Sequence, residues 1–159
     1  DGNFEALPFD DDSMDVVWSQ DAILHSGNRE KVFQEVDRVL RPGGHFIFTD
    51  PMMRAGVDLK ALQPVLDRIH LADLGSVDTY VSYAEKLGWK HVEYDGKTSQ
   101  LINHYSAVLD NLESRTEELT KEISPEYIEN MKRGLAHWIN AGKAGHLAWG
   151  VLHFEKPKA

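Results

Sequence analysis

The order of apolar and polar positions predicts strands that alternate with helices in the first third of the chain. Residues 14–19 form a short apolar, β-branched run between polar segments, which is typical of a buried strand. From Asn28 the apolar residues fall on one stripe of a helix, and residues 42–44 (Pro-Gly-Gly) end it. Residues 45–50 are typical of a second strand. This alternation predicts an α/β fold with a parallel sheet and helices on its faces.

The middle of the chain continues this alternation. A helix is expected to start near Pro64, because the first turn of a helix does not need the N–H that proline lacks. Ser76 is expected to cap the following helix, and Gly88 to end it in a left-handed conformation. Residues 89–94 then predict another strand.

Two long amphipathic helices are predicted before the last strand. They cover residues 101–122 and 125–141, and Gly142 closes the second one. The last strand is expected at residues 148–155. No internal repeat or linker divides the sequence, so we expect residues 1–159 to belong to a single domain.

The composition restricts the class of protein. The chain has 26 acidic and 17 basic residues, a net charge of −9 that disfavours nucleic acid as a partner. It has no cysteine, which excludes disulfides, thiolate zinc sites and a cysteine nucleophile. The apolar runs stay well below the roughly 20 residues of a membrane helix, and the first residues lack the features of a signal peptide. We therefore expect a cytoplasmic protein without a membrane partner.

Several sequence motifs occur in one order and at one spacing. Leu-Pro-Phe at residues 7–9, the strand at 15–19 and the Pro-Gly-Gly segment at 38–44 together resemble the second half of class I S-adenosylmethionine-dependent methyltransferases. Four further segments, at residues 19–26, 49–52, 63–69 and 130–138, are similar to the sarcosine/dimethylglycine N-methyltransferases, which make the osmoprotectant glycine betaine.

The resemblance implies a fold and an extent. The chain is expected to be the C-terminal part of a Rossmann-like methyltransferase sheet, with a helical lid at about residues 101–146 before the last strand. The glycine-rich cofactor loop and the acidic residue that grips the ribose would lie outside this sequence. The family's strand order, 3-2-1-4-5-7-6, would make residues 14–19 an exposed edge through which the chain could self-associate.

The resemblance also implies a function. S-adenosylmethionine would be the cofactor, and its methyl group would pass to the nitrogen of sarcosine or dimethylglycine, the small-molecule amine substrate. One alternative is a related methyltransferase that acts on phosphoethanolamine, or on carbon in sterol and quinone synthesis. Another alternative is a non-catalytic folded fragment that self-associates.

Asp21 and His25 are the candidate catalytic residues. They lie four residues apart just beyond the strand at 14–19, at the carboxyl edge where parallel sheets bind ligands, and could share one face of a helical turn. Similarity to phosphoethanolamine methyltransferases implies that this pair contacts the amine and removes its proton. In the alternative interpretation, Asp21 caps a helix and His25 is a half-buried core residue.

Three residues are candidates for cofactor binding. The resemblance places Asn3 and Phe4 against the adenine, although an ordinary loop is an equal alternative. The backbone carbonyl of Gln20 could accept a hydrogen bond from the cofactor's amino group.

A substrate with a carboxylate and a methylated ammonium needs basic and aromatic partners. The candidates are Arg68, His104, Tyr105, Lys132 and Arg133. For the basic side chains, a solvated helix face is the alternative. Trp138, Trp149 and Tyr83 could form an aromatic cage or could be ordinary core residues. The histidines lack a paired ligand spacing, so no metal site is expected.

Overall fold

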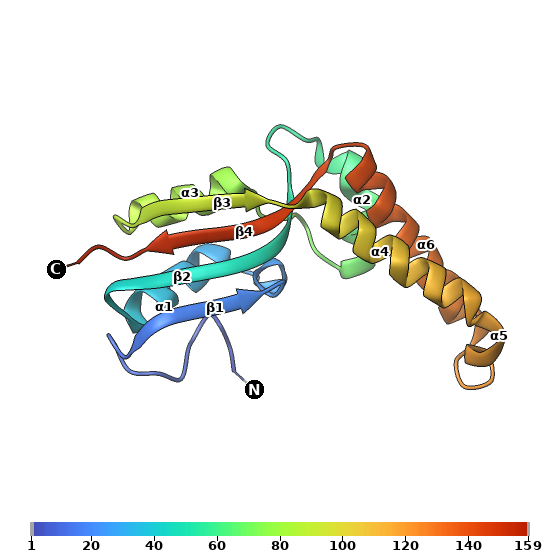
Figure 1. Cartoon of the computed structure of the whole chain (residues 1–159), viewed down its shortest axis with the longest axis horizontal. Helices are drawn as coiled ribbons and strands as arrows, with labels where there is room; N and C mark the ends of the chain where they lie inside the picture. Colours follow the sequence, from blue (N-terminus) through green and yellow to red (C-terminus); the bar gives the residue numbers. More distant parts are fainter. Residues whose placement is uncertain (1, 159) are drawn as a thin grey trace.

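The computed structural model describes residues 2–158, which contain a four-stranded sheet (Figure 1). Its strands are β1 (Met14–Gln20), β2 (Leu40–Met53), β3 (Lys90–Gly96) and β4 (Leu147–Glu155), in the spatial order β1-β2-β4-β3. β1 is parallel to β2, whereas β4 is antiparallel to both of its neighbours. This order matches the 4-5-7-6 portion of the strand order implied by the resemblance, so the predicted order and the edge position of β1 are confirmed. The prediction of a parallel sheet is wrong for β4, whose antiparallel pairing makes the sheet mixed.

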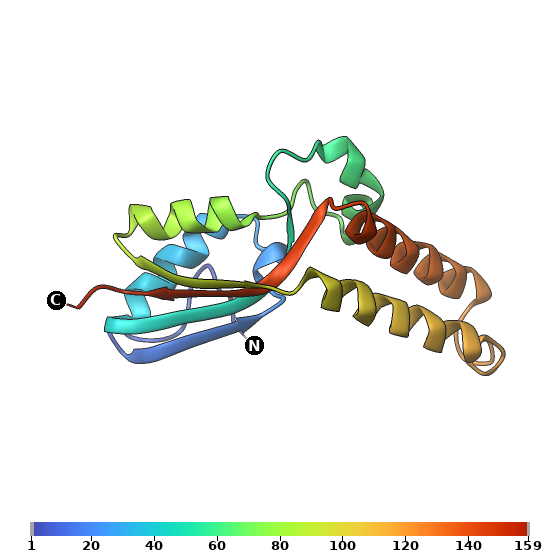
Figure 2. The ribbon, with the colours of Figure 1, turned by 45° about the horizontal axis from the view of Figure 1, so that its top comes forward.

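Helices α1 (Arg29–Val39) and α3 (Val77–Lys86) lie on the same face of the sheet (Figure 2). Phe33 of α1 is fully buried and packs edge-on against Phe46 and Phe48 of β2, with ring centroids 5.4 and 5.9 Å away. Tyr80 of α3 is buried in the same cluster, which we name the first core. This aromatic packing holds α1 and α3 against one face of the sheet.

The structure corrects the predicted start of β2. Leu40 pairs with Met14 of β1, so the chain is already extended at this residue. Residues 42–44 therefore lie inside β2 and do not end the helix, which stops at Val39. The sheet pairing, which is not visible in the local sequence, determines this boundary.

The helix predicted to start near Pro64 starts earlier. α2 covers Leu59–Ile69, and the Asp58 side chain accepts a hydrogen bond from the backbone N–H of Lys60 at its start. Pro64 thus lies inside α2, where burial of neighbouring apolar residues offsets the lost backbone hydrogen bond. The predicted cap at Ser76 and the left-handed conformation of Gly88 are both confirmed.

A helical hairpin extends beyond the carboxyl edge of the sheet (Figures 1 and 2). It consists of α4 (Thr98–Ser114), the short α5 (Thr116–Leu119) and α6 (Pro125–Lys143). The single helix predicted at residues 101–122 is therefore divided. Gly142 does not close α6 but lies inside it, since the helix continues to Lys143. A β-carbon on Gly142 would lie 2.8 Å from Ile102 Cγ1 of α4. A small residue is needed where these helices meet.

Within residues 2–158, no helix combines the length and the apolar character needed to cross a bilayer.

Candidate functional site

A cavity of about 330 Å³ lies at the carboxyl end of β1, between the sheet and α4. The sheet and its adjoining loops contribute Gln20, Asp21, Pro51 and Trp149 to its lining. α4 contributes Gln100, Leu101, His104 and Tyr105. The packing of α4 over the sheet edge therefore brings together four of the predicted site residues, namely Gln20, Asp21, His104 and Tyr105.

Asp21 is held in a defined orientation at this cavity. Its backbone has a left-handed φ of 48° and donates a hydrogen bond to the Thr49 carbonyl over 2.9 Å. Its Oδ1 accepts a hydrogen bond of 2.8 Å from the indole Nε1–H of Trp149. The next helical element, a 3₁₀ turn at Ile23–His25, has Ala22 at its N-cap and no side-chain cap. The interpretation of Asp21 as a helix cap is therefore wrong.

His25 ends this 3₁₀ turn and is exposed. Its backbone N–H donates to the Ala22 carbonyl over 3.1 Å, and the buried side chains of Ile23 and Leu24 anchor the turn. His25 is thus not a half-buried core residue, and it does not share a regular helical turn with Asp21, whose φ is positive. His25 is not among the side chains that line the cavity.

Asp50 was not predicted as a site residue. It is fully buried within β2, three residues before its end, and its carboxylate accepts hydrogen bonds from the Leu24 backbone N–H (3.0 Å) and the Tyr80 hydroxyl (2.5 Å). Burial raises the pKa of Asp50 to about 7, although both hydrogen bonds and the charge of Arg29 oppose this effect. Asp50 thereby ties the sheet to the turn that carries His25.

Tyr105 is a partly buried residue of α4 that lines the cavity. Its ring packs on Trp138 with centroids 5.3 Å apart. Burial raises the pKa of the Tyr105 hydroxyl, the Asp21 carboxylate raises it further, and the Arg68 guanidinium lowers it. Arg68 itself does not line the cavity, and its contact with the substrate stays a prediction.

The basic residues on α6 lie away from the cavity. Lys132 forms an ion pair with Glu129 (3.0 Å), and Arg133 donates a hydrogen bond to Asn130. Arg133 also lines an open groove of about 410 Å³ between α2 and α6, together with Arg68. The Lys132 side chain is 20% exposed, and its contact with the substrate stays a prediction.

Asn3 and Phe4 do not line the cavity either. The Asn3 side chain accepts a hydrogen bond from the Glu5 backbone N–H over 2.9 Å, and Phe4 packs against the first core. Their contact with adenine stays a prediction.

The three aromatic residues considered for a cage do not lie together, because Tyr83 belongs to another core than Trp138 and Trp149. Trp149 lines the cavity, and Trp138 is buried beneath Tyr105. Tyr83 packs against Phe33 of the first core, with ring centroids 5.6 Å apart. A cage built from these three side chains is therefore wrong, and Trp149 is the member that faces the cavity.

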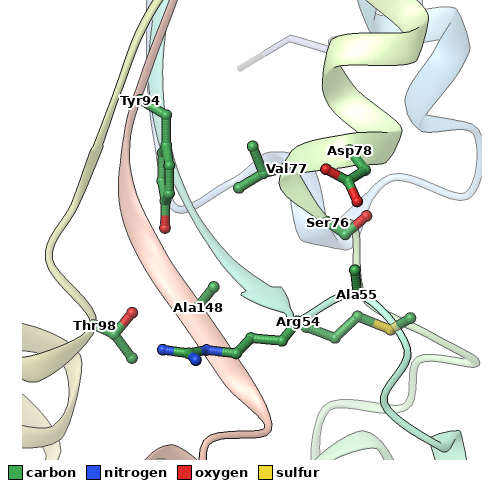
Figure 3. A pocket seen from close by; sticks show the side chains of 9 residues that line it. Arg54, Ala55, Ser76, Val77, Asp78, Tyr94, Thr98 and Ala148 are labelled. Atoms are coloured by element: carbon green, nitrogen blue, oxygen red, sulfur yellow. The ribbon is translucent and has the colours of Figure 1, made fainter.

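A second cavity of about 200 Å³ lies beside the start of α3 (Figure 3). Figure 3 shows the Arg54 side chain extended toward Thr98, with Tyr94 above it and Asp78 across the cavity. None of the predicted catalytic, cofactor-binding or substrate-binding residues lines this cavity, which makes the first cavity the better candidate. Within residues 2–158, no three His, Asp or Glu side chains gather in a group that could hold a metal ion.

Comparison with known proteins identifies the fold and the relatives of the chain. Residues 1–48 match the family described as a methyltransferase domain. The chain is 59% identical over 99% of its length to a sarcosine/dimethylglycine N-methyltransferase of Aphanothece halophytica, and 47% identical to a dimethylglycine N-methyltransferase of Parasynechococcus marenigrum. It covers 57% and 56% of these relatives, so it spans a little over half of their length.

Solved structures agree with this result. A candidate sarcosine dimethylglycine methyltransferase from Galdieria sulphuraria superposes with a TM-score of 0.92 at 46% identity, over 98% of this chain and 58% of that one. A phosphoethanolamine N-methyltransferase from Haemonchus contortus superposes with a TM-score of 0.86 at 19% identity, over 98% of this chain and 36% of that one, and supports the fold alone. The class I methyltransferase fold predicted from the sequence is confirmed.

Proposed function

From this similarity we infer that the chain belongs to the sarcosine/dimethylglycine N-methyltransferases, and we propose that the whole protein methylates these amines to give glycine betaine. The names of the relatives supply the substrates. The observation that carries the proposal is the Asp21 carboxylate, which accepts a hydrogen bond from Trp149 where both residues line the cavity. A carboxylate beside aromatic faces suits a methylated ammonium ion.

We propose distinct roles for the two candidate catalytic residues. Asp21 binds the ammonium group of the substrate, and His25 accepts its proton, because an amine nitrogen attacks a methyl group only when its lone pair is free. The new N–CH₃ bond forms as the S–CH₃ bond of the donor breaks. The support for His25 is its place at the end of the 3₁₀ turn that follows Asp21 and that Asp50 holds through the Leu24 N–H.

S-adenosylmethionine is the proposed methyl donor and supplies an electrophilic methyl group on a sulfonium. Gln20 fits the amino end of this cofactor, because it lines the cavity next to Asp21 and offers carbonyl oxygens as acceptors. Asn3 and Phe4 are proposed to meet the adenine.

We propose that the chain is the C-terminal portion of the enzyme, with α4, α5 and α6 as a lid. Two observations support this proposal. The chain covers only 57% of its relative from Aphanothece halophytica, and its four strands match strands 4, 5, 7 and 6 of the strand order implied by the resemblance. On this proposal the remaining portion carries the glycine-rich cofactor loop, and the isolated chain is inactive.

We propose self-association for the isolated chain, because Val16 and Trp18 of edge strand β1 are 52% and 57% exposed. Light scattering tests this proposal. Trp18→Lys should return the chain to a monomer, whereas Tyr127→Lys, at a site of 58% exposure on α6, should not. A monomeric unsubstituted chain would refute self-association.

A cytoplasmic location stays a prediction.

The activity is tested with the full-length protein, labelled S-adenosylmethionine, and sarcosine, dimethylglycine or phosphoethanolamine as acceptor. We expect label in dimethylglycine and glycine betaine. Label in the N-methylated product of phosphoethanolamine alone would favour the alternative of a phosphoethanolamine methyltransferase. Calorimetry with S-adenosylmethionine on the isolated chain then shows whether this portion binds the cofactor by itself.

A further inference from the structure

The first turn of α4 is bound to the residue that orients Asp21. The backbone N–H of Lys97 donates a hydrogen bond of 2.7 Å to the Trp149 carbonyl, and the backbone N–H of Trp149 donates one of 3.2 Å to Thr98 Oγ1. The indole of Trp149 in turn donates to the Asp21 carboxylate. Trp149 therefore fixes the position of this helical turn relative to Asp21.

Gln100 lies in the same turn and lines the cavity, although it was not predicted as a site residue. Its backbone N–H donates to the Lys97 carbonyl over 2.8 Å, so its place in the turn is defined. The Gln100 side chain is exposed, and its amide carries two N–H donors. These donors are accessible to a ligand in the cavity.

Gln100 and His104 form one stripe on α4. They are four residues apart, which places them on the same face of the helix, and both line the cavity. The neighbouring stripe of Leu101 and Tyr105 packs into the core that contains Trp138, and this packing fixes the rotation of α4. The α4 wall of the cavity thus offers an amide and an imidazole as hydrogen-bond donors.

The two walls of the cavity differ in charge. The wall formed by the sheet and its loops carries the Asp21 carboxylate. Within residues 2–158, the lining that α4 supplies contains no acidic side chain. A zwitterion whose ammonium group lies against Asp21 therefore turns its carboxylate away from the sheet and toward α4, where a carboxylate meets donors and no like charge.

We propose that Gln100 is a specificity-determining residue, whose amide N–H donates to the carboxylate of the amino-acid substrate beside His104. This inference rests on the proposed function and adds the residue that recognises the substrate carboxylate. A site built to hydrogen-bond one group of a substrate discriminates against an analogue that lacks this group. Gln100 thereby favours an amino acid over an amine without a carboxylate.

The test is Gln100→Leu in the full-length enzyme, with dimethylglycine as substrate and N,N-dimethylethanolamine as competitor. The two molecules share the dimethylammonium group, but the competitor has a hydroxyl group in place of the carboxylate. We expect KM for dimethylglycine to rise about tenfold, the usual loss for a hydrogen bond to a charged group. The inhibition constant of dimethylethanolamine and the affinity for S-adenosylmethionine should change far less.

Gln100→Glu keeps the shape of the side chain and places a negative charge on the α4 wall. KM for dimethylglycine should rise further than in Gln100→Leu, because two carboxylates repel each other. Dimethylethanolamine, which carries only the positive charge, should inhibit this variant at least as well as it inhibits the unsubstituted enzyme. A purely structural role of Gln100 would not move the two constants in opposite directions.

Gln34→Leu is the matched control. Gln34 is exposed on α1 and does not line the cavity. We expect this variant to leave KM for dimethylglycine and the inhibition constant of dimethylethanolamine unchanged.

The inference is overturned if Gln100→Leu leaves KM for dimethylglycine unchanged, weakens both ligands by the same factor, or acts no differently from Gln34→Leu. Stronger binding of dimethylglycine by Gln100→Glu would also overturn it. Should the unsubstituted enzyme fail to methylate dimethylglycine, the proposed function fails and this inference with it. Should that enzyme be active while Gln100→Leu has the same KM, the inference alone fails.

Discussion

The indole of Trp149 donates a 2.8 Å hydrogen bond to Asp21, a residue 128 positions earlier in the chain. This bond joins the loop after β1 to the first half of β4. It gives the Asp21 carboxylate one fixed oxygen and leaves the other for a cationic ligand. The aromatic ring beside the carboxylate makes this pair suited to a methylated ammonium.

Trp149→Phe should weaken substrate binding, because phenylalanine keeps an aromatic face but lacks the N–H that orients Asp21. We expect KM for dimethylglycine to rise about three- to tenfold, as measured by steady-state kinetics. Trp89→Phe is the control, since it removes a similar 2.7 Å hydrogen bond from an indole N–H to Asp37 outside the cavity. Equal effects of the two variants on KM would refute a specific role for Trp149.

Asp21→Asn separates charge from shape. Asparagine tolerates the left-handed backbone and can still accept the Trp149 hydrogen bond, but it carries no charge. We expect the affinity for dimethylglycine, measured by calorimetry, to fall about tenfold or more. If the variant changes thermal stability but binds the amine normally, Asp21 has only a structural role.

His25→Ala should lower kcat by more than about a hundredfold and leave S-adenosylmethionine binding intact, as expected for a positioned base. Rapid-quench assays at neutral pH measure this loss. His91→Ala, at an exposed position near the start of β3, serves as the control. An unchanged rate in His25→Ala would exclude it as the proton acceptor.

The local sequence was sufficient for most elements and insufficient for the site's geometry. The apolar run at 14–19 and the Ser76 cap predicted β1 and the start of α3, because both depend on neighbouring residues. The Trp149–Asp21 bond could not be predicted, since it depends on which residues the sheet and α4 bring together. Asp50 was missed for the same reason: its burial and its partner Tyr80 are products of tertiary packing.

Asp50→Asn tests the buried carboxyl through the pH dependence of stability. Burial raises the pKa of Asp50 to about 7, so between about pH 4 and pH 7 the folded protein holds a proton that the unfolded chain has released. The contribution of Asp50 to the free energy of unfolding is therefore full below about pH 4 and is lost as the pH rises through 7.

Urea unfolding of the wild type and the variant at several pH values measures this effect. Stability of the wild type relative to Asp50→Asn should fall by a few kcal/mol from about pH 4 to about pH 8. Tyr80→Phe removes a hydrogen bond that lowers the pKa, so it should move the transition to higher pH. A pH-independent difference would contradict the buried, protonated carboxyl.

The most direct test of the site is a crystal structure of the full-length protein with dimethylglycine and S-adenosylhomocysteine. The account predicts that the substrate nitrogen lies against the Asp21 carboxylate and the Trp149 ring. Dimethylglycine bound outside the cavity, or with its carboxylate against Asp21, would contradict it.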